Sequence, residues 1–339
     1  MKKHQFLFLT GMIVMLAVTG CTQSETETPA AAKNEMKNIS MQLQWFTQAQ
    51  FAGYYVALEK GWYKDEGLVL TIYPGGPDIV PVDIVTGGSK DFGTTLLADL
   101  AVSIQKGKPA VSIAQIQQNN GLKLLSKAAS GIREPKNFIG KTVGVWLGGW
   151  EVQFNALLAQ AGIPQEKVNV VSQGFSMAPF LEDRIDVASA MIYNEYYMVL
   201  SSGIHKEDLV VIDYADYNLD FPGDVLFTSL KMVKENPETC LKMLRASLRG
   251  WKYAIENQDE AVNIVLKHDK SGVAAQDHQK KMMSEIAGLV RGERAARIGY
   301  MDSIALQRMT NLLVQYKILD AEIAQERIFT PQFLDQIKD

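Results

Sequence analysis

The spacing of hydrophobic positions changes between two periods along most of the chain. Residues 41–45 alternate apolar and polar side chains with period two, which is typical of a half-buried strand. The apolar positions of residues 51–63 recur every three or four residues, as on one face of a helix. Residues 68–73 again predict a strand. This alternation favours a largely parallel sheet with helices on its faces.

Predicted strands and helices continue to alternate toward the C-terminus. After about residue 227 the prediction is mostly helical. Strands are predicted at 91–93, 110–117, 141–146, 168–171, 187–192 and 209–213, and helices at 96–106, 150–161, 177–184, 237–257, 259–267, 276–289 and 303–316. A chain of 339 residues exceeds the usual size of one hydrophobic core, which favours two lobes.

The pattern divides the chain into five segments. We predict a signal segment at 1–20, a tether at 21–38, the first part of lobe 1 at 39–132, lobe 2 at 133–226, and the completion of lobe 1 with the C-terminal helices at 227–339. The two crossings would form a hinge, and the cleft between the lobes is the default place for a small ligand.

The N-terminal segment carries an export pattern. Lys2 and Lys3 precede an apolar run at residues 6–18 that is too short to span a bilayer. Small residues then stand just before Cys21, which resembles a bacterial lipobox and predicts lipid attachment there and a location on the outer face of the cell membrane. The alternative is an ordinary signal peptide with an incidental cysteine. Residues 22–37 are polar and predict a flexible tether.

Composition and scattered reactive residues exclude several functions. The formal net charge of -4 offers no broad basic surface, so we expect no nucleic-acid partner. Cys240 has no partner beyond the anchor cysteine, and the histidines make no metal-ligand spacing. No phosphate loop or nucleophile elbow is present, so we expect no enzyme activity, no metal and no cofactor.

Aromatic and amide side chains gather where strands end. Trp45 ends the first strand, with Gln44, Gln48 and Gln50 around it. Aromatic faces and neutral amides are what a flat nitrogen heterocycle needs for stacking and for edge hydrogen bonds. The alternatives are a core tryptophan and ordinary surface glutamines.

Two glycine-containing turns extend this candidate site. Gly76, with its neighbour Gly75, would bring backbone N–H groups close to a ligand at a helix start, and Asp78 would accept a hydrogen bond. The alternative is a tight turn capped by Asp78. Glycines 148–149 precede Trp150, which would close over the ligand from the second lobe, unless it only packs on its helix.

Four passages resemble the THI5/NMT1-type (thiamine-pyrimidine-synthase-like, SsuA/THI5) periplasmic binding proteins. They are LQW at 43–45 with AGYYVA at 52–57 and KGWY at 60–63; GKTVGV at 140–145; DVA at 186–188 with NEY at 194–196; and AIEN at 254–257 with EA at 260–261. The resemblance implies an α/β chain with the type II periplasmic-binding-protein fold. It also implies a monomeric solute-binding protein of an ABC importer, whose partners are a permease and an ATPase.

The resemblance also suggests ligands and roles. WFTQAQFAGYY at 45–55 and PGGPDI at 74–79 look closer to the riboflavin-binding group than to the receptors for a thiamine pyrimidine precursor, hydroxymethylpyrimidine or formylaminopyrimidine. Trp45 matches a ligand-contacting tryptophan of the pyrimidine receptors, and Glu195, beside Asn194, matches their acidic residue that binds the amino edge. A glutamate favoured by the helix dipole is the competing explanation for Glu195.

Two further functions remain open at this point. An alkylsulfonate or nitrate receptor would predict basic or helix-terminal anion contacts, whereas the candidate segments are aromatic and rich in amides. A secreted enzyme of pyrimidine metabolism would require a cofactor, and the cysteine-rich iron-binding run of the eukaryotic synthases has no match here.

Overall fold

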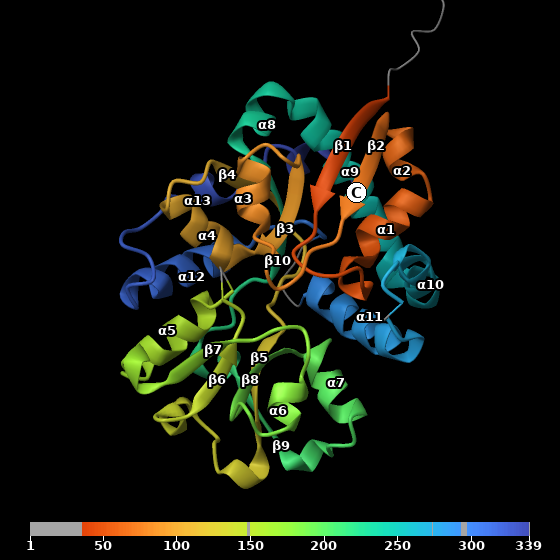
Figure 1. The fold of residues 1–339 in the computed structure, drawn as a ribbon. Coiled ribbons are helices and arrows are strands. Elements are labelled where there is room, and N and C mark those ends of the chain that lie inside the picture. The colour runs from red at the N-terminus through yellow and green to blue at the C-terminus, as the bar shows by residue number, and fades with distance from the viewer. Residues whose placement is uncertain (1–35, 148–149, 273, 293–296, 339) are drawn as a thin grey trace, which may run out of the picture. The chain divides into compact units, whose positions relative to one another are not determined.

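The computed structural model describes residues 36–147, 150–272, 274–292 and 297–338, and these contain two five-stranded sheets (Figure 1). The first sheet has the order β2-β1-β3-β10-β4 and the second the order β7-β6-β8-β5-β9. We call the first sheet with its helices the first lobe, and the second sheet with its helices the second lobe.

The first sheet contains one reversed strand. β1 (Lys37–Gln42) pairs in parallel with β2 (Leu68–Tyr73) and with β3 (Phe92–Leu96). β10 (Asp224–Ser229) pairs antiparallel with β3 and with β4 (Ala110–Gln115). β3 and β4 are buried along their whole length because helices cover both faces of the sheet.

The second sheet repeats this arrangement. β6 (Thr142–Val145) pairs in parallel with β7 (Asn169–Ser172) and β8 (Val187–Met191), while β5 (Leu122–Lys127) runs antiparallel to β8 and to β9 (Leu209–Asp213). β5 and β10 are each the first strand after the chain crosses from the other sheet. The crossings therefore account for the two antiparallel strands. The sequence predicted a largely parallel sheet and did not predict these reversals.

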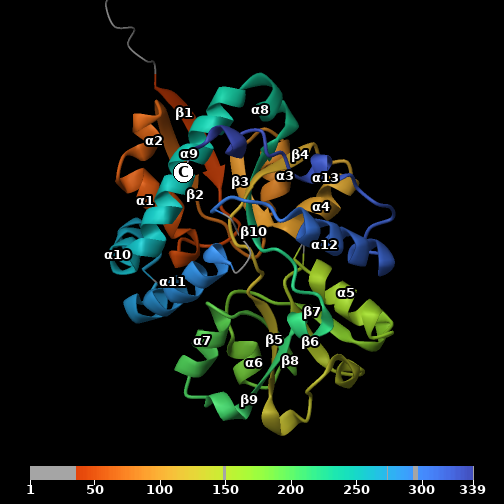
Figure 2. The same cartoon turned by 180° about the vertical axis from the view of Figure 1, so that it is seen from behind.

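Helices cover the sheets, and the C-terminal ones return to the first lobe (Figures 1 and 2). The first lobe carries α1 (Ala52–Glu59), α2 (Trp62–Asp65), α3 (Pro81–Thr86), α4 (Leu97–Gln105), α8 (Leu230–Glu235), α9 (Pro237–Glu256), α10 (Gln258–His268), α11 (Gln276–Arg291), α12 (Ser303–Gln315) and α13 (Gln325–Ile328). The second carries α5 (Val152–Gln160), α6 (Ala178–Leu181) and α7 (Glu195–Ser201).

Three details differ from the sequence-based expectation. The helix expected at 51–63 is divided into α1 and α2, because Gly61 adopts a left-handed conformation with φ 77°. β5 lies in the second sheet, although residues 39–132 were assigned to the first lobe. β10 begins in the first sheet at residue 224, within the range assigned to the second lobe.

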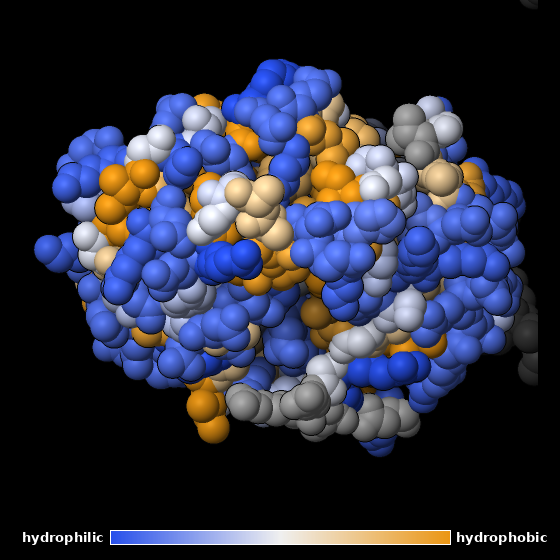
Figure 3. Space-filling view, turned by 90° about the horizontal axis from the view of Figure 1, so that it is seen from below, coloured by the Kyte–Doolittle hydropathy of each residue, from blue (hydrophilic) through white to orange (hydrophobic). Residues whose placement is uncertain are grey.

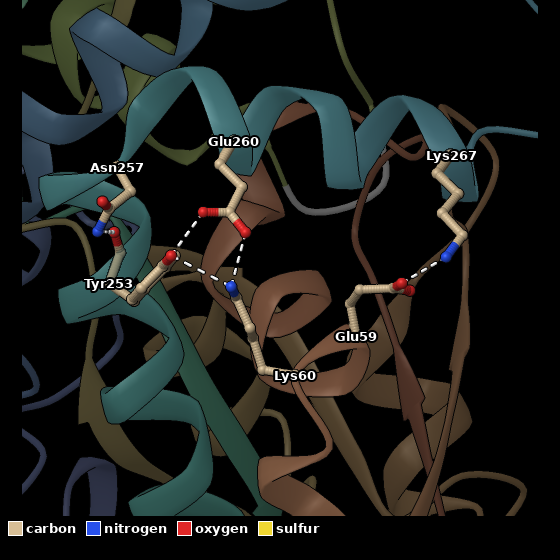
Figure 4. Close-up of polar contacts among 6 residues, drawn as sticks. All are labelled: Glu59, Lys60, Tyr253, Asn257, Glu260 and Lys267. Atoms are coloured by element: carbon tan, nitrogen blue, oxygen red, sulfur yellow. Dashed lines mark hydrogen bonds and ion pairs between the residues drawn. The ribbon is translucent and has the colours of Figure 1, made fainter.

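Two glycines let α1 and α9 pack in close contact. A Cβ atom on Gly250 would lie 2.0 Å from the carbonyl oxygen of Gly53, and one on Gly53 would lie 2.3 Å from the Trp251 ring. Salt bridges join the C-terminal end of α1 to α10: Lys60 Nζ lies 2.6 Å from Glu260, and Glu59 pairs with Lys267 (Figure 4). These pairs are solvent-accessible, so the glycine contact contributes more to stability than they do.

The surface seen from below Figure 1 is mainly hydrophilic, with hydrophobic residues in separate groups (Figure 3). Among the described residues, no helix combines the length and the apolar character that crossing a membrane requires.

The glycine contact predicts opposite effects of one substitution at two helical sites. Gly250→Ala should lower the free energy of unfolding by about 2 kcal/mol or more, because its methyl group would overlap the α1 backbone. Gly288→Ala, on the exposed face of α11 with open space around it, should instead stabilise by about 0.5–1 kcal/mol. Urea unfolding measures both. Equal effects of the two substitutions would refute the close-packing argument.

Candidate functional site

Two buried tryptophans meet where strands of the two sheets end. Trp45 lies just past the carboxyl end of β1, Trp146 directly follows β6, and each is 3% exposed. Their ring centroids are 5.6 Å apart in an edge-on arrangement. Trp150 lies 5.4 Å from Trp45 and 5.8 Å from Trp146. One residue of the first lobe and two of the second thus form a tryptophan cluster across the lobe boundary.

Two phenylalanines extend this cluster. The Phe175 ring of the second lobe lies 6.4 Å from Trp45 and 5.0 Å from Phe46 of the first lobe. Aromatic pairs at these distances contribute about 0.5–1.5 kcal/mol each beyond the burial of their area. Ring contacts therefore help to hold the lobes together at this edge.

A small cavity lies inside the tryptophan cluster. It is lined by Trp45, Gln48, Gln50, Trp146, Trp150, Met191, Tyr193, Asn194 and Glu195. Its volume is about 10 Å³, roughly the space of one water molecule. In this closed arrangement the protein's own rings fill the space that a flat ligand would need.

A much larger cavity adjoins the small one. Its volume is about 500 Å³, and it shares Gln48 and Asn194 with the small cavity. The remaining lining residues are Phe46, Thr47, Phe175, Met198, Ser201, Ser202, Ala274, Ala275, Asp277, His278, Gln279 and Lys281, so both lobes contribute. Its mostly apolar walls and its volume are those of pockets that bind small organic molecules.

Three glutamine amides converge on one buried carboxylate. Asp224, the first residue of β10, accepts hydrogen bonds from Nε2 of Gln44 at 2.7 Å, Gln50 at 2.8 Å and Gln117 at 3.0 Å. Burial raises the pKa of Asp224 to about 6, against the lowering effect of the Gln50 and Gln44 amides. Gln50 in turn accepts from Gln48 Nε2 at 2.9 Å. This network fixes the amide orientations beside the small cavity.

A second buried carboxyl group approaches from the other lobe. Glu195, the first residue of α7, accepts from the Met191 backbone N–H at 2.9 Å and from Asn194 Nδ2 at 2.6 Å. Burial raises the pKa of Glu195 to about 7. Asn194 Oδ1 lies 2.8 Å from His278 Nε2 of α11, and burial lowers the pKa of His278. This hydrogen bond joins the two lobes beside the large cavity.

The structure brings most of the predicted site residues together. Around the small cavity it places Trp45, Gln48, Gln50, Trp150, Asn194 and Glu195. Gln44 lies behind it, fully buried against Asp224. Glycines 148–149 and Cys21 lie outside the described residues.

The turn at residues 74–78 is placed differently from the expectation. The Gly75 N–H donates to the Trp45 carbonyl at 2.8 Å and is not free for a ligand. Gly76 packs near the Phe46 ring, and Asp78 is exposed and lines neither cavity. The following helix begins only at Pro81, with Val80 as its N-cap, so Asp78 neither caps it nor faces the cavities.

Other residues of the site were not predicted. Trp146 could have been found by the argument that found Trp45, because it too ends a strand. Phe175, His278 and Asp224 stand in passages without a motif, and only the folded chain brings them to the cleft. No group of three or more His, Cys, Asp or Glu side chains in the described ranges is arranged to hold a metal ion.

Comparison with known proteins gives one family and several relatives. The family model described as NMT1/THI5 like matches residues 48–261. The riboflavin-binding protein RibY of Chloroflexus aurantiacus is 27% identical, over 98% of this chain and 99% of that protein. The formylaminopyrimidine-binding protein of Halalkalibacterium halodurans is 26% identical, over 75% and 77%. A 4-amino-5-hydroxymethyl-2-methylpyrimidine phosphate synthase of Legionella pneumophila is 26% identical, over 67% and 72%.

Solved structures share the fold at low sequence identity. A protein of Bordetella bronchiseptica has a TM-score of 0.73 at 18% identity, covering 89% of this chain and 97% of that one. The alkanesulfonate-binding protein SsuA of Xanthomonas axonopodis has a TM-score of 0.66 at 11% identity, covering 87% and 99%. The predicted α/β periplasmic-binding-protein fold is confirmed.

The buried Glu195 predicts a pH-dependent stability. Its folded pKa of about 7 exceeds the ordinary value of 4.5, so the folded chain holds a proton that the unfolded chain releases. Its contribution to stability is therefore largest below about pH 4.5 and declines as pH rises to about 7, by roughly 3 kcal/mol at most. Glu195→Gln should flatten the pH dependence of Tm in this window. Glu207→Gln, at an exposed position, is the control, and a slope unchanged by Glu195→Gln would refute the assignment.

Proposed function

Because the chain belongs to the NMT1/THI5-like family, as its motifs predicted, we propose that it is the solute-binding protein of an ABC importer and that riboflavin is its ligand. The observation that carries the proposal is the cleft between the lobes, in which aromatic rings and oriented amides border a cavity of about 500 Å³. The relative named riboflavin-binding protein RibY, aligned along nearly the whole of both chains, supports this ligand.

The size and chemistry of the cleft favour a large flat ligand. A tricyclic ring with a side chain suits a cavity of this volume, whereas a single pyrimidine ring would leave most of it empty. The indoles of Trp45 and Trp150 offer faces for stacking, and Gln48 and Asn194 offer amide donors and acceptors at the ring edge.

Lobe closure provides the transport signal. The small cavity has no room for a ring until Trp45 and Trp150 separate, so the ligand enters an open form. A ligand that contacts both lobes then binds the closed form more tightly and raises its population. The permease would recognise this closed form. We place the lobe boundaries at the crossings, residues 116–121 and 214–223.

A thiamine pyrimidine precursor is the second candidate ligand. Its support is the buried carboxyl of Glu195 beside the tryptophan cluster, which is suited to bind an amino-substituted ring edge. The relative named formylaminopyrimidine-binding protein points the same way.

We also propose that the chain acts by binding alone. Other members of the comparison are named as synthases, but the residues around the small cavity are rings, amides, one thioether and one carboxyl group. This set is suited to hold a heterocycle in place.

Riboflavin binding should depend on Trp45. Purified protein should quench riboflavin fluorescence on titration and turn yellow when saturated. Trp45→Ala should weaken binding about tenfold or more, because stacking a flat heterocycle on an aromatic ring contributes about 1–3 kcal/mol. Trp150→Ala, at a half-buried position, tests the opposite face with less risk to folding.

Trp62→Ala is the matched control, because Trp62 lies on α2 against Arg249 and Tyr253, away from both cavities. Absence of quenching by the wild-type protein would refute riboflavin as the ligand. Binding unaffected by Trp45→Ala and Trp150→Ala would refute the site.

The lipobox-like sequence predicts membrane attachment through Cys21. In a bacterial host, Cys21→Ser should move the protein from the membrane fraction to the soluble fraction, because the acyl chains would no longer be attached. Cys240→Ser, at the buried cysteine of α9, should leave the distribution unchanged. Membrane retention of the Cys21→Ser protein would contradict lipid anchoring.

A further inference from the structure

Two buried side-chain oxygens close to Asp224 have no hydrogen-bond partner among the described residues. Asp99, in the first turn of α4, is 4% exposed, and its Oδ2 has no hydrogen-bond partner among the described residues. Gln44 is 0% exposed, and its Oε1 is likewise unpartnered there. An unsatisfied buried acceptor costs about 1–3 kcal/mol. A ligand hydroxyl group, which can both donate and accept, would complete the hydrogen bonding of both atoms.

These acceptors lie at the edge of the first sheet that faces the second lobe. Leu96, at the end of β3, pairs with Asp224, and the next residue, Leu97, donates its N–H to the Gly223 carbonyl at 3.1 Å. α4 thus begins beside Asp224, to which Gln44 donates. From the second lobe, Glu151 follows Trp150 of the tryptophan cluster. Burial, and then the charges of Glu151 and Asp224, raise the pKa of Asp99 well above its ordinary value.

Each glutamine amide of this region commits one of its two N–H groups to a partner within the chain. Nε2 of Gln44, Gln50 and Gln117 donates to Asp224, and Nε2 of Gln48 donates to Gln50. Among the described residues, those that line the small cavity include no Lys, Arg or His but do include Glu195. The described residues that line the large cavity do include a cation, Lys281, which is accompanied by Asp277.

We propose that the small-cavity end of the cleft selects an uncharged ligand bearing hydroxyl or amine donors and rejects its phosphorylated or sulfonated counterpart. Hydroxyl groups of the ligand would satisfy Asp99 Oδ2 and Gln44 Oε1 when the lobes close, because a hydroxyl group can donate and accept. An anionic group would face the carboxyl groups of Glu195 and Asp224 with its own charge unpaired, and such like-charge contacts cost several kcal/mol. The inference rests on the proposed function, because it takes the cleft as the ligand site.

Riboflavin and riboflavin 5′-phosphate provide the direct test, because they differ only in the phosphate. Fluorescence titration of the purified full-length chain at pH 7.5 should give at least tenfold tighter binding of riboflavin. Equal affinity, or tighter binding of the phosphate, would overturn the inference while leaving riboflavin as the ligand.

Glu195→Gln tests the origin of the preference, because at pH 7.5 it removes the negative charge of the carboxyl group that lines the small cavity and keeps its shape. The affinity ratio of riboflavin to its phosphate should fall about threefold or more, since one of the like charges is lost. Asp208→Asn, at an exposed position of the second lobe, should leave the ratio unchanged. A folded Glu195→Gln protein with the wild-type ratio would remove Glu195 from the explanation. The wild-type ratio itself tests the preference even if this variant does not fold.

The preference for an uncharged ligand can be tested even if riboflavin does not bind. If neither flavin binds, the riboflavin proposal fails, and calorimetry with hydroxymethylpyrimidine and its phosphate then replaces the flavin pair. The inference expects the unphosphorylated pyrimidine to bind more tightly. Preferential binding of the phosphate would overturn it.

Discussion

The contact of Trp45 with Trp146 and Trp150 is the interaction on which the rest of the site depends. Each sheet places a tryptophan just past the carboxyl end of a strand, and the two edges meet through these rings. Because the indoles pack on one another, the protein closes its own cleft to about 10 Å³ at this point. A ligand ring must replace these contacts, so its affinity is the difference between ligand stacking and self-stacking.

The site and the hinge share residues. Asp224 is the first residue of β10, directly after the second crossing, and Gln117 lies in the first crossing. The two are hydrogen-bonded to each other, and Gln50 connects them to the small cavity. Movement of the lobes about the crossings therefore displaces the carboxylate that orients the amides, so binding geometry and lobe position change together.

Local periodicity predicted most helices and strands, including β2 at its observed bounds, because apolar spacing is set by the element itself. It predicted neither β5 nor β10, and sheet pairing depends on partners far away in the chain. The glycines of residues 74–78 were misinterpreted for a related reason. A Cβ on Gly75 would lie 2.3 Å from the Leu43 carbonyl oxygen, so that glycine is needed for packing between backbone segments.

The candidate aromatic and amide residues could be found from the sequence because both types stand next to strand ends, where parallel sheets expose side chains to ligands. The hydrogen-bond partners of these residues could not be found from the sequence. Whether Gln44 presents an N–H or a carbonyl oxygen depends on Asp224, which is 180 residues away and contacts it only in the folded chain. A fold shared with an alkanesulfonate-binding protein therefore leaves the charge preference open. In this chain the preference for an uncharged ligand follows from Asp224, which accepts hydrogen bonds from three glutamine amides. Gln44 then has its amide nitrogen bound to Asp224 and its amide oxygen unpartnered among the described residues.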